Sequence, residues 1–391
     1  MLNRLDHLPP LPLFIDYRPG YGVTILTEQD ELAICHALRL HDRVYHIELE
    51  LPPSILRKVF VLLDGQFPIL EHLSLTFSAT SENCLPPFIL PKTFLASNLR
   101  HLALPTSITP PRRLHLLTPT VSLVTLALSE IQTSSYFRPR LLVARLSSLL
   151  LLEELCIEFS TPIPRPSTEA ELLGEQRAPI TLPSLKVLQF KGVGAYLECL
   201  VAQIRAPLLE QLRITLFNQI AFALSHLSDL IKTAQTYPQR VAWIDFNRDE
   251  VSITTDRRGL PSLAFFQLQV ICKPLDWQID CAAQICHALI PALSGVERLR
   301  LNYHNTKIPT EWQIGEIDGT TWHELLRSFI GAKELYIHDA LLEELSLVLK
   351  VGEVGLDPGF LPNLRSITAK DNLFALFIDT RRVAGRPVRF V

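Results

Sequence analysis

The chain has 391 residues, of which 48% are apolar and 20% charged, and its formal net charge is −3. This apolar content excludes a disordered chain, and the small net charge argues against a protein that binds nucleic acid through its overall field. Seven cysteines without a CxxC pair, a start unlike a signal peptide and no apolar run long enough for a membrane span predict a cytoplasmic or nuclear protein.

One short pattern, apolar-x-x-apolar-x-apolar, recurs along most of the chain. Its last three positions alternate as in a strand with one buried face. Successive copies start roughly 22 to 36 residues apart, close to the spacing of leucine-rich repeats. The clear copies start at Leu70, Leu99, Leu123, Leu152, Leu185, Leu209 and Val296, and the weaker ones at Val44, Val241, Leu263, Ala332 and Leu364.

The segments between the copies predict return elements. Met1–Asp30 is rich in proline and has no clear period, whereas Val251–Thr255 indicates an extra strand, and Thr161–Thr168 indicates a loop. Helical spacing of apolar residues and capping signals predict several helices. Two are expected directly after Ser54, which would be the cap, and after Gly194, and a third at Trp322–Ile330 with Thr320 or Thr321 as its cap. The others are expected at Glu31–Leu40, Arg138–Leu149, Glu169–Glu175, Ile220–Ala234 and Ile279–Ile290.

One strand and one return segment per repeat predict an α/β leucine-rich-repeat solenoid with a curved parallel sheet on its concave side and helices on its convex side. Residues 1–40 are expected to cap the amino-terminal end, 41–373 to form one solenoid of irregular repeats, and 374–391 to form a basic carboxy-terminal cap or tail. Deleting either cap should lower solubility. The regular succession of repeats is expected to break down between Val241 and Leu268.

Several segments carry a resemblance to a known family. They are Leu2–Leu13, Ala37–Val44, Leu51–Lys58, Phe67–Leu75, Asp276–Gln278 with Ala283–Cys286, and Arg382–Val388. These stretches resemble the leucine-rich-repeat region of the expanded F-box protein families of mushroom-forming fungi, and the similarity runs over most of the chain.

The resemblance implies a place in ubiquitin ligation. In that family an amino-terminal F-box docks a Skp-type adaptor of a cullin ubiquitin ligase, and the repeats select the target. No F-box is recognisable in Met1–Asp30. A truncated sequence, a fragment and a family member without ligase coupling are the alternatives, and a Skp-type adaptor and cullin are expected partners only if an F-box is supplied.

The central positions of the strand motif are expected to form one row of side chains on the face away from the core. Small residues dominate the first half of this row and larger polar ones the second. Arginine and tyrosine are enriched in binding hot spots, so the second half predicts a protein-binding face, against the alternative of a solvated surface. The candidate residues are Arg213, Asp245, Gln267, Arg298, Arg300 and Tyr336.

An adjacent column holds His46, His72 and His101 on three successive predicted strands. Stacked imidazoles can bind a metal or sense pH. No cysteine or carboxylate is expected beside this column, so solvated polar surface is the favoured interpretation. The sequence therefore predicts no metal site and no cofactor.

Signs of catalysis are weak. Glu153 and Glu154 are expected on opposite faces or edges of their strand, and Glu158 at its end, which argues against a working acid–base pair. Gly192-Val-Gly194 lacks the third glycine of a dinucleotide-binding turn, and Cys281 and Cys286 are expected in the core.

The sequence thus predicts a non-catalytic scaffold that recognises proteins and binds neither nucleic acid nor a membrane. The first interpretation is the substrate-binding region of an F-box-type ligase receptor. The alternatives are a freestanding interaction scaffold unrelated to ubiquitin and, less favoured, an α/β enzyme.

Overall fold

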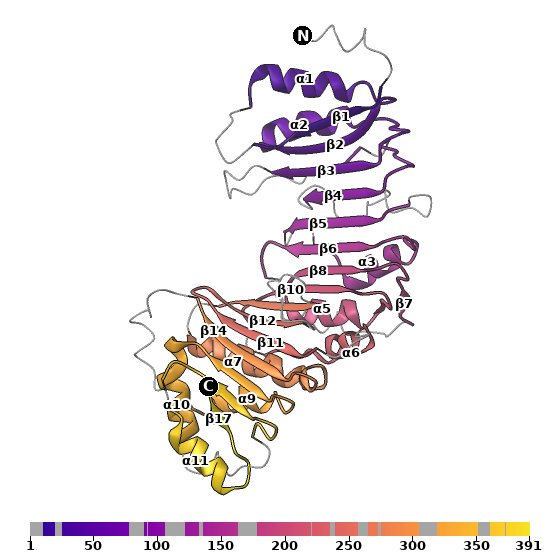
Figure 1. The fold of residues 1–391 in the computed structure, drawn as a ribbon. Coiled ribbons are helices and arrows are strands. Elements are labelled where there is room, and N and C mark those ends of the chain that lie inside the picture. Colours follow the sequence, from indigo (N-terminus) through magenta and orange to yellow (C-terminus); the bar gives the residue numbers. More distant parts are fainter. Residues whose placement is uncertain are drawn as a thin grey trace. The chain divides into compact units, whose positions relative to one another are not determined.

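The structure is a computed structural model that describes residues 11–19, 26–77, 90–91, 93–105, 122–132, 136–162, 178–219, 221–234, 239–256, 265–272, 275–304, 319–350, 360–371 and 373–391 (Figure 1). The chain divides into two compact units. The amino-terminal unit comprises residues 1–192 and 203–209, and the carboxy-terminal unit comprises 193–202 and 210–391.

The amino-terminal unit is built on parallel strands in the order β1-β2-β3-β4-β5-β6-β8. Every strand from β2 to β8 in this order coincides with a copy of the sequence pattern, which confirms the predicted repeats. The first strand lies in the proline-rich opening segment, where no strand was predicted. The bounds are β1 Leu13–Tyr17, β2 Val44–Leu51, β3 His72–Phe77, β4 His101–Pro105, β5 Thr125–Ile131, β6 Glu154–Phe159 and β8 Val187–Gly192.

The repeated pattern encodes a turn as well as a strand. The N–H of the first leucine donates to the carbonyl three residues earlier, as Leu70 does to Phe67 and Leu99 to Ala96. The next residue then donates to the preceding repeat, as Arg100 does to the carbonyl of Glu71 at 2.8 Å. Each copy therefore fixes the register of its strand against the previous one.

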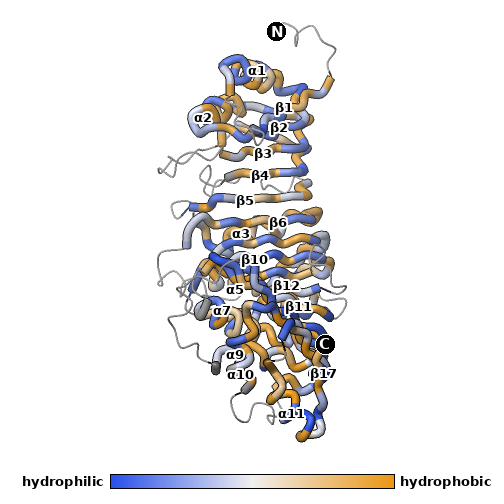
Figure 2. Tube along the Cα trace, turned by 60° about the vertical axis from the view of Figure 1, so that its left-hand side comes forward, coloured by the Kyte–Doolittle hydropathy of each residue, from blue (hydrophilic) through white to orange (hydrophobic). Residues whose placement is uncertain are grey.

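Alternation along the strands places the leucines of the pattern in the core. In β3, Leu73 and Leu75 are fully buried, while Ser74 between them is partly exposed. Figure 2 shows apolar and polar stretches following one another along these strands. The large apolar area removed from water in every repeat is the main stabilising term of the fold.

Three α-helices are described in the amino-terminal unit: α1 Glu28–Leu38, α2 Pro53–Leu62 and α3 Pro139–Leu146. Helix α1 begins earlier than predicted because Thr27 and Asp30 form a capping box. Ser54 does not cap α2. Pro52 holds that position without a side-chain hydrogen bond, and Pro53 begins the helix, where the absence of an N–H is tolerated.

The carboxy-terminal unit has the strand order β10-β13-β12-β11-β14-β15-β16-β17. Strand β12 is antiparallel to both of its neighbours, and the other pairs among these strands are parallel. This confirms the extra strand and the irregularity predicted between Val241 and Leu268. The bounds are β10 Gln211–Phe217, β11 Val241–Phe246, β12 Glu250–Asp256, β13 Phe266–Ile271, β14 Arg298–Tyr303, β15 Glu334–Ile337, β16 Ser366–Thr368 and β17 Arg389–Phe390.

The helices described in the carboxy-terminal unit are α5 Gly194–Val201, α6 Ser225–Ala234, α7 Leu275–Ala288, α8 Ile290–Leu293, the 3-10 helix η7 Asp339–Leu341, α9 Gly319–Arg327, α10 Leu342–Lys350 and α11 Ala375–Val383. Thr320 and Thr321 lie inside the first turn of α9 and not before it, so neither is its cap. Helix α6 begins at Ser225, five residues after the predicted start at Ile220.

Two short strands, β7 Ile180–Thr181 and β9 Ile204–Arg205, pair in a separate small sheet. The predicted helix Glu169–Glu175 and most of the predicted loop Thr161–Thr168 lie outside the described residues. Among the described helices, none combines the length and the apolar character needed to cross a bilayer. The chain is therefore a mixed α/β protein with extensive parallel strand pairing and helices between the strands.

Candidate recognition surface

The candidate binding residues lie on one face of the strands of the carboxy-terminal unit. Arg213 pairs in register with Gln267, and Arg300 pairs with Tyr336. Side chains alternate along a strand, so residues two positions apart point to the same face. Arg298 lies two residues before Arg300, and Asp245 lies two residues after the ladder partner of Arg300, so both point to this face. We call the six residues Arg213, Asp245, Gln267, Arg298, Arg300 and Tyr336 the recognition face.

Asp245 does not stand in the single row that the motif predicted. Trp243, and not Asp245, is the partner of Arg300 across the ladder, and Asp245 pairs with Asn302. Trp243 is only 5% exposed, and its antiparallel partner Thr254 is also 5% exposed. Two buried side chains therefore separate Arg213 and Gln267 from Arg300 and Tyr336.

The most concentrated part of the recognition face lies on β14 and β15. The Arg300 guanidinium carbon is 5.9 Å from the centroid of the Tyr336 ring, close enough for a cation–π contact. Tyr336 is 40% exposed, which is high for a large aromatic side chain. Arg298 pairs across the ladder with Glu334. An exposed arginine held against an exposed tyrosine is a preorganised contact surface.

Asp245 belongs to a polar cluster that the motif did not predict. Its Oδ1 accepts hydrogen bonds from Asn302 Nδ2 at 2.8 Å and from His304 Nε2 at 2.9 Å. The signal was present in the sequence, because Asn302 lies two residues after Arg300 on β14 and His304 follows the strand at the next position of the same alternation. This contact orders the edge of the recognition face beside Arg300.

The histidine column lies on the amino-terminal unit, as the motif predicted. His46, His72 and His101 occupy paired positions on β2, β3 and β4. The rings of His46 and His72 are stacked, with centroids 4.1 Å apart and planes inclined by 12°. The His101 ring is tilted away from His72, and its Nδ1 lies 3.1 Å from Thr125 Oγ1.

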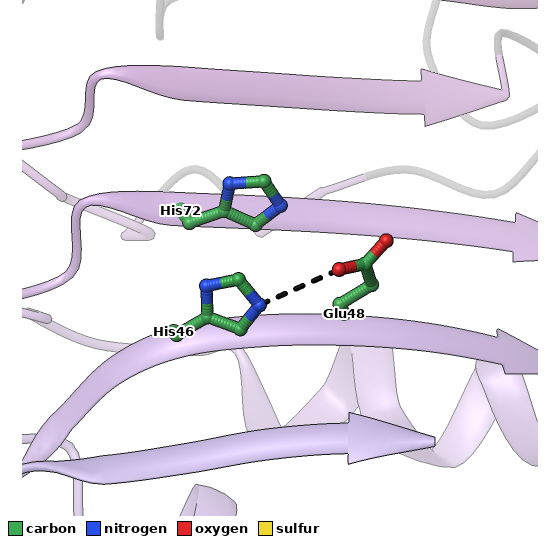
Figure 3. A group of neighbouring side chains, drawn as sticks. All are labelled: His46, Glu48 and His72. Atoms are coloured by element: carbon green, nitrogen blue, oxygen red, sulfur yellow. Dashed lines mark ion pairs between the residues drawn. The ribbon is translucent and has the colours of Figure 1, made fainter. Parts of the chain in front are cut away.

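The expectation that this column lacks a carboxylate is wrong. Glu48 follows His46 by two residues on β2 and points to the same face, so its Oε2 lies 3.5 Å from His46 Nε2 (Figure 3). The Arg18 guanidinium also forms an ion pair with Glu48. Burial, followed by the charge of His46, lowers the pKa of His72 from its usual value.

The other carboxylates singled out in the sequence do not converge. Glu153 forms an ion pair with Lys186 at 2.8 Å, and Glu154 at the start of β6 is exposed. Glu158 accepts a hydrogen bond from Gln189 Nε2 at 2.7 Å. Glu153 and Glu158 therefore serve separate contacts, and Glu154 is exposed.

The remaining candidates are structural. Gly192 ends β8, where an added Cβ would stand 2.7 Å from the Phe190 ring, and the Gly194 N–H donates to Gln219 Oε1 at 3.0 Å as α5 begins. A side chain at either position would meet its neighbours, which explains the glycines through packing. Cys281 and Cys286 are buried, as predicted.

A leucine-rich-repeat protein is among the solved structures that align with this chain. A crystal structure of the leucine-rich repeat-containing protein LegL7 from Legionella pneumophila aligns over 97% of this chain and 99% of that chain, with 10% identity and a TM-score of 0.28. At that TM-score the alignment does not establish a common fold, so the repeat assignment rests on the strand pairing itself. No family model and no curated protein matches the sequence.

Proposed function

We propose that this chain is a non-catalytic protein-recognition scaffold. Its repeats form a leucine-rich-repeat solenoid in which the strands line a concave face and the helices a convex one. The proposal is supported by the parallel pairing of the repeat strands, which only the antiparallel strand β12 interrupts, because such arrays present an extended side-chain surface to a partner. Regular spacing of the strands leaves successive side chains about 4.8 Å apart.

The single observation that carries the proposal is the cluster of Arg298, Arg300 and Tyr336 on β14 and β15. The Arg300 side chain lies over the exposed Tyr336 ring, so both groups enter a complex already ordered. Ordering a flexible side chain on binding costs about 0.5–1.5 kcal/mol, and this arrangement avoids part of that cost. Two adjacent arginines favour a partner segment that carries carboxylates or a carboxy-terminal end.

Affinity capture tests this proposal. The full chain and a variant carrying Arg300→Ala and Tyr336→Ala serve as baits in lysate from the cells that express the chain, and mass spectrometry identifies what each retains. Truncation of a hot-spot pair costs at least about 2 kcal/mol, so the variant should lose its partners by about thirtyfold in affinity.

A matched control carries Arg382→Ala and Trp277→Ala, which remove an exposed arginine and an exposed aromatic side chain from helices of the same unit. This control should retain the same partners as the full chain. Equal retention by all three baits would show that the recognition face does not hold the partner.

The finer proposal is that the partner is a ubiquitination target and the chain belongs to an F-box-type ligase receptor. It is supported by the resemblance of the segments Leu51–Lys58 and Phe67–Leu75, both part of the described repeats. The same capture separates the two versions. A Skp-type adaptor and cullin retained by every bait favour the ligase receptor, whereas their absence favours a freestanding scaffold.

A further inference from the structure

Three metal-ligating side chains meet on the amino-terminal unit, whereas the recognition face belongs to the carboxy-terminal unit. One potential ligand atom from each of His46, Glu48 and His72 can be chosen so that all three lie within 4.8 Å of one another. In Figure 3 a ring nitrogen of each histidine and the Glu48 carboxylate face the same space between β2 and β3. Within the described part of the chain, this is the one such group of His, Cys, Asp and Glu.

The strand pairing explains why these side chains meet. His46 and His72 are direct partners in the parallel ladder, and Glu48 stands two residues after His46 on the same face. Backbone hydrogen bonds therefore fix the origin of all three side chains, and only side-chain rotation remains free. Phe14 stacks on the other side of the His46 ring, with centroids 5.3 Å apart, and limits that rotation.

His72 Nε2 is buried and makes no hydrogen bond within the described residues. A buried polar atom without a partner is costly, and a ligand that is not part of the protein is one physical explanation for it. By contrast, the Glu48 carboxylate already contacts Arg18, whose side chain is 57% exposed and free to move into solvent.

We propose that His46, Glu48 and His72 bind a divalent cation of the late first transition series, with Zn²⁺ as the best match. Two imidazoles and one carboxylate form a donor set that suits Zn²⁺ and its neighbours better than Mg²⁺ or Ca²⁺, which prefer oxygen ligands. The fourth coordination position is left to water or to a donor from a bound protein.

Binding one ion requires the three ligand atoms, which lie within 4.8 Å of one another, to draw closer and the stacked rings of His46 and His72 to turn toward a common point. Ligands of one tetrahedral zinc ion lie about 3.3 Å apart, which follows from metal–ligand distances near 2.0–2.2 Å. The His46 and Glu48 atoms already approach this value at 3.5 Å. The ion would displace the Arg18 guanidinium from Glu48, so Arg18 competes with the metal for the same carboxylate.

Calorimetric titration of the untagged full chain with Zn²⁺ tests the proposal. His72→Ala should weaken Zn²⁺ binding by at least about tenfold, because substitution of residues that only hydrogen-bond to a metal ligand already weakens metal binding by about that factor. Glu48→Gln, which preserves side-chain shape, should also weaken binding. Arg18→Ala should strengthen it several-fold, because it removes the competing cation.

His304→Ala is the matched control, since His304 also contacts a carboxylate but belongs to no such group of three ligands among the described residues. It should leave the binding constant unchanged. Far-UV circular dichroism verifies folding of each variant, and the ligand-field absorption of Co²⁺ in place of Zn²⁺ reports nitrogen and oxygen coordination. Wild-type affinity in His72→Ala and Glu48→Gln, or no gain in Arg18→Ala, would overturn the proposal.

Discussion

At the scale of single residues, burial and a neighbouring carboxylate suppress the reactivity of the Cys156 thiol. Burial, then the Glu158 charge and its hydrogen bond with the thiol, raise the pKa of Cys156 to about 12. The thiolate is the reactive form, so Cys156 should be alkylated slowly by iodoacetamide at pH 7.5.

Glu158→Gln should accelerate the alkylation of Cys156 several-fold, because it removes the negative charge while leaving burial in place. Mass spectrometry of the Cys156 peptide over time gives the rate. Glu154→Gln is the matched control, since Glu154 is an exposed carboxylate on the same strand. Similar acceleration by both variants would contradict the assigned contact.

Glu130 carries backbone strain. Its φ is 53°, and it lies where the pairing of β5 with β6 shifts between Leu128 and Ile131. An L-residue in this left-handed region costs about 1–2 kcal/mol, whereas the extra chain entropy of glycine costs about 0.5–1 kcal/mol. Glu130→Gly should therefore raise the free energy of unfolding by about 0.5–1 kcal/mol, measured by urea titration.

This gain should depend on pH. Burial and the Glu158 charge raise the pKa of Glu130, so its folded-state value exceeds its unfolded value. Such a group contributes stability below its unfolded pKa and loses that contribution as pH rises through its folded pKa. The advantage of Glu130→Gly should thus be larger at pH 7 than at pH 4. Destabilisation by Glu130→Gly, or a smaller gain at pH 7, would contradict this account.

At the scale of elements, Glu198 on α5 caps the start of α6. Its carboxylate oxygens each accept a backbone N–H at 2.8 Å, from His226 and from Leu227, and one also contacts Ser225 Oγ. Glu198 is 8% exposed, so water does not replace these bonds when they are lost. A charged cap at a helix amino terminus also complements the helix dipole.

Glu198→Ala should lower the free energy of unfolding by about 2–3 kcal/mol, because it leaves two helix N–H groups without their acceptor. Thermal and urea denaturation measure this change. Glu198→Gln should recover part of the loss through its single amide oxygen. A change below about 0.5 kcal/mol for Glu198→Ala would show that the cap is dispensable.

Element positions were predictable from sequence wherever the pattern is local. Leu73 and Leu75 define β3 through their own alternation, and the turn before the strand is encoded by Leu70. Strand β1 escaped prediction because it lies in a proline-rich segment whose apolar residues show no clear period. The Glu198 cap escaped because it joins residues far apart in the chain.

At the scale of the whole molecule, the register of β11 marks the limit of the pattern. Both faces of β11 are buried up to Ile244, so polarity does not identify the outward positions. The template placed Ile244 and Phe246 at the paired leucine positions, whereas Ala242 and Ile244 occupy them. A slip of two residues keeps every side chain on its face, and alternation alone does not detect it.

A different reason explains what was missed in the histidine column. The sequence placed His46, His72 and His101 together, and it also placed Glu48 in the neighbouring row. The contact between these rows depends on side-chain rotamers, which strand periodicity does not specify.

The carboxy-terminal segment, residues 374–391, should be required for the solubility of the chain. Strand β17 covers the edge of β16, and Phe377 of α11 packs against the buried Phe360. Deleting residues 374–391 should uncover this edge and apolar surface, and should therefore lower solubility. Light scattering and the fraction recovered after centrifugation measure the effect. An equally soluble truncated chain with cooperative unfolding would contradict the cap assignment.

The central claim is that the recognition face contacts a protein partner directly. Photo-crosslinking tests it when the aromatic photoreactive residue p-benzoylphenylalanine replaces Tyr336, and a second variant carries it in place of the exposed Trp277 on α7. A protein adduct is expected from position 336 and none from position 277. An adduct from position 277 alone, equal adducts from both, or none from position 336 would contradict it.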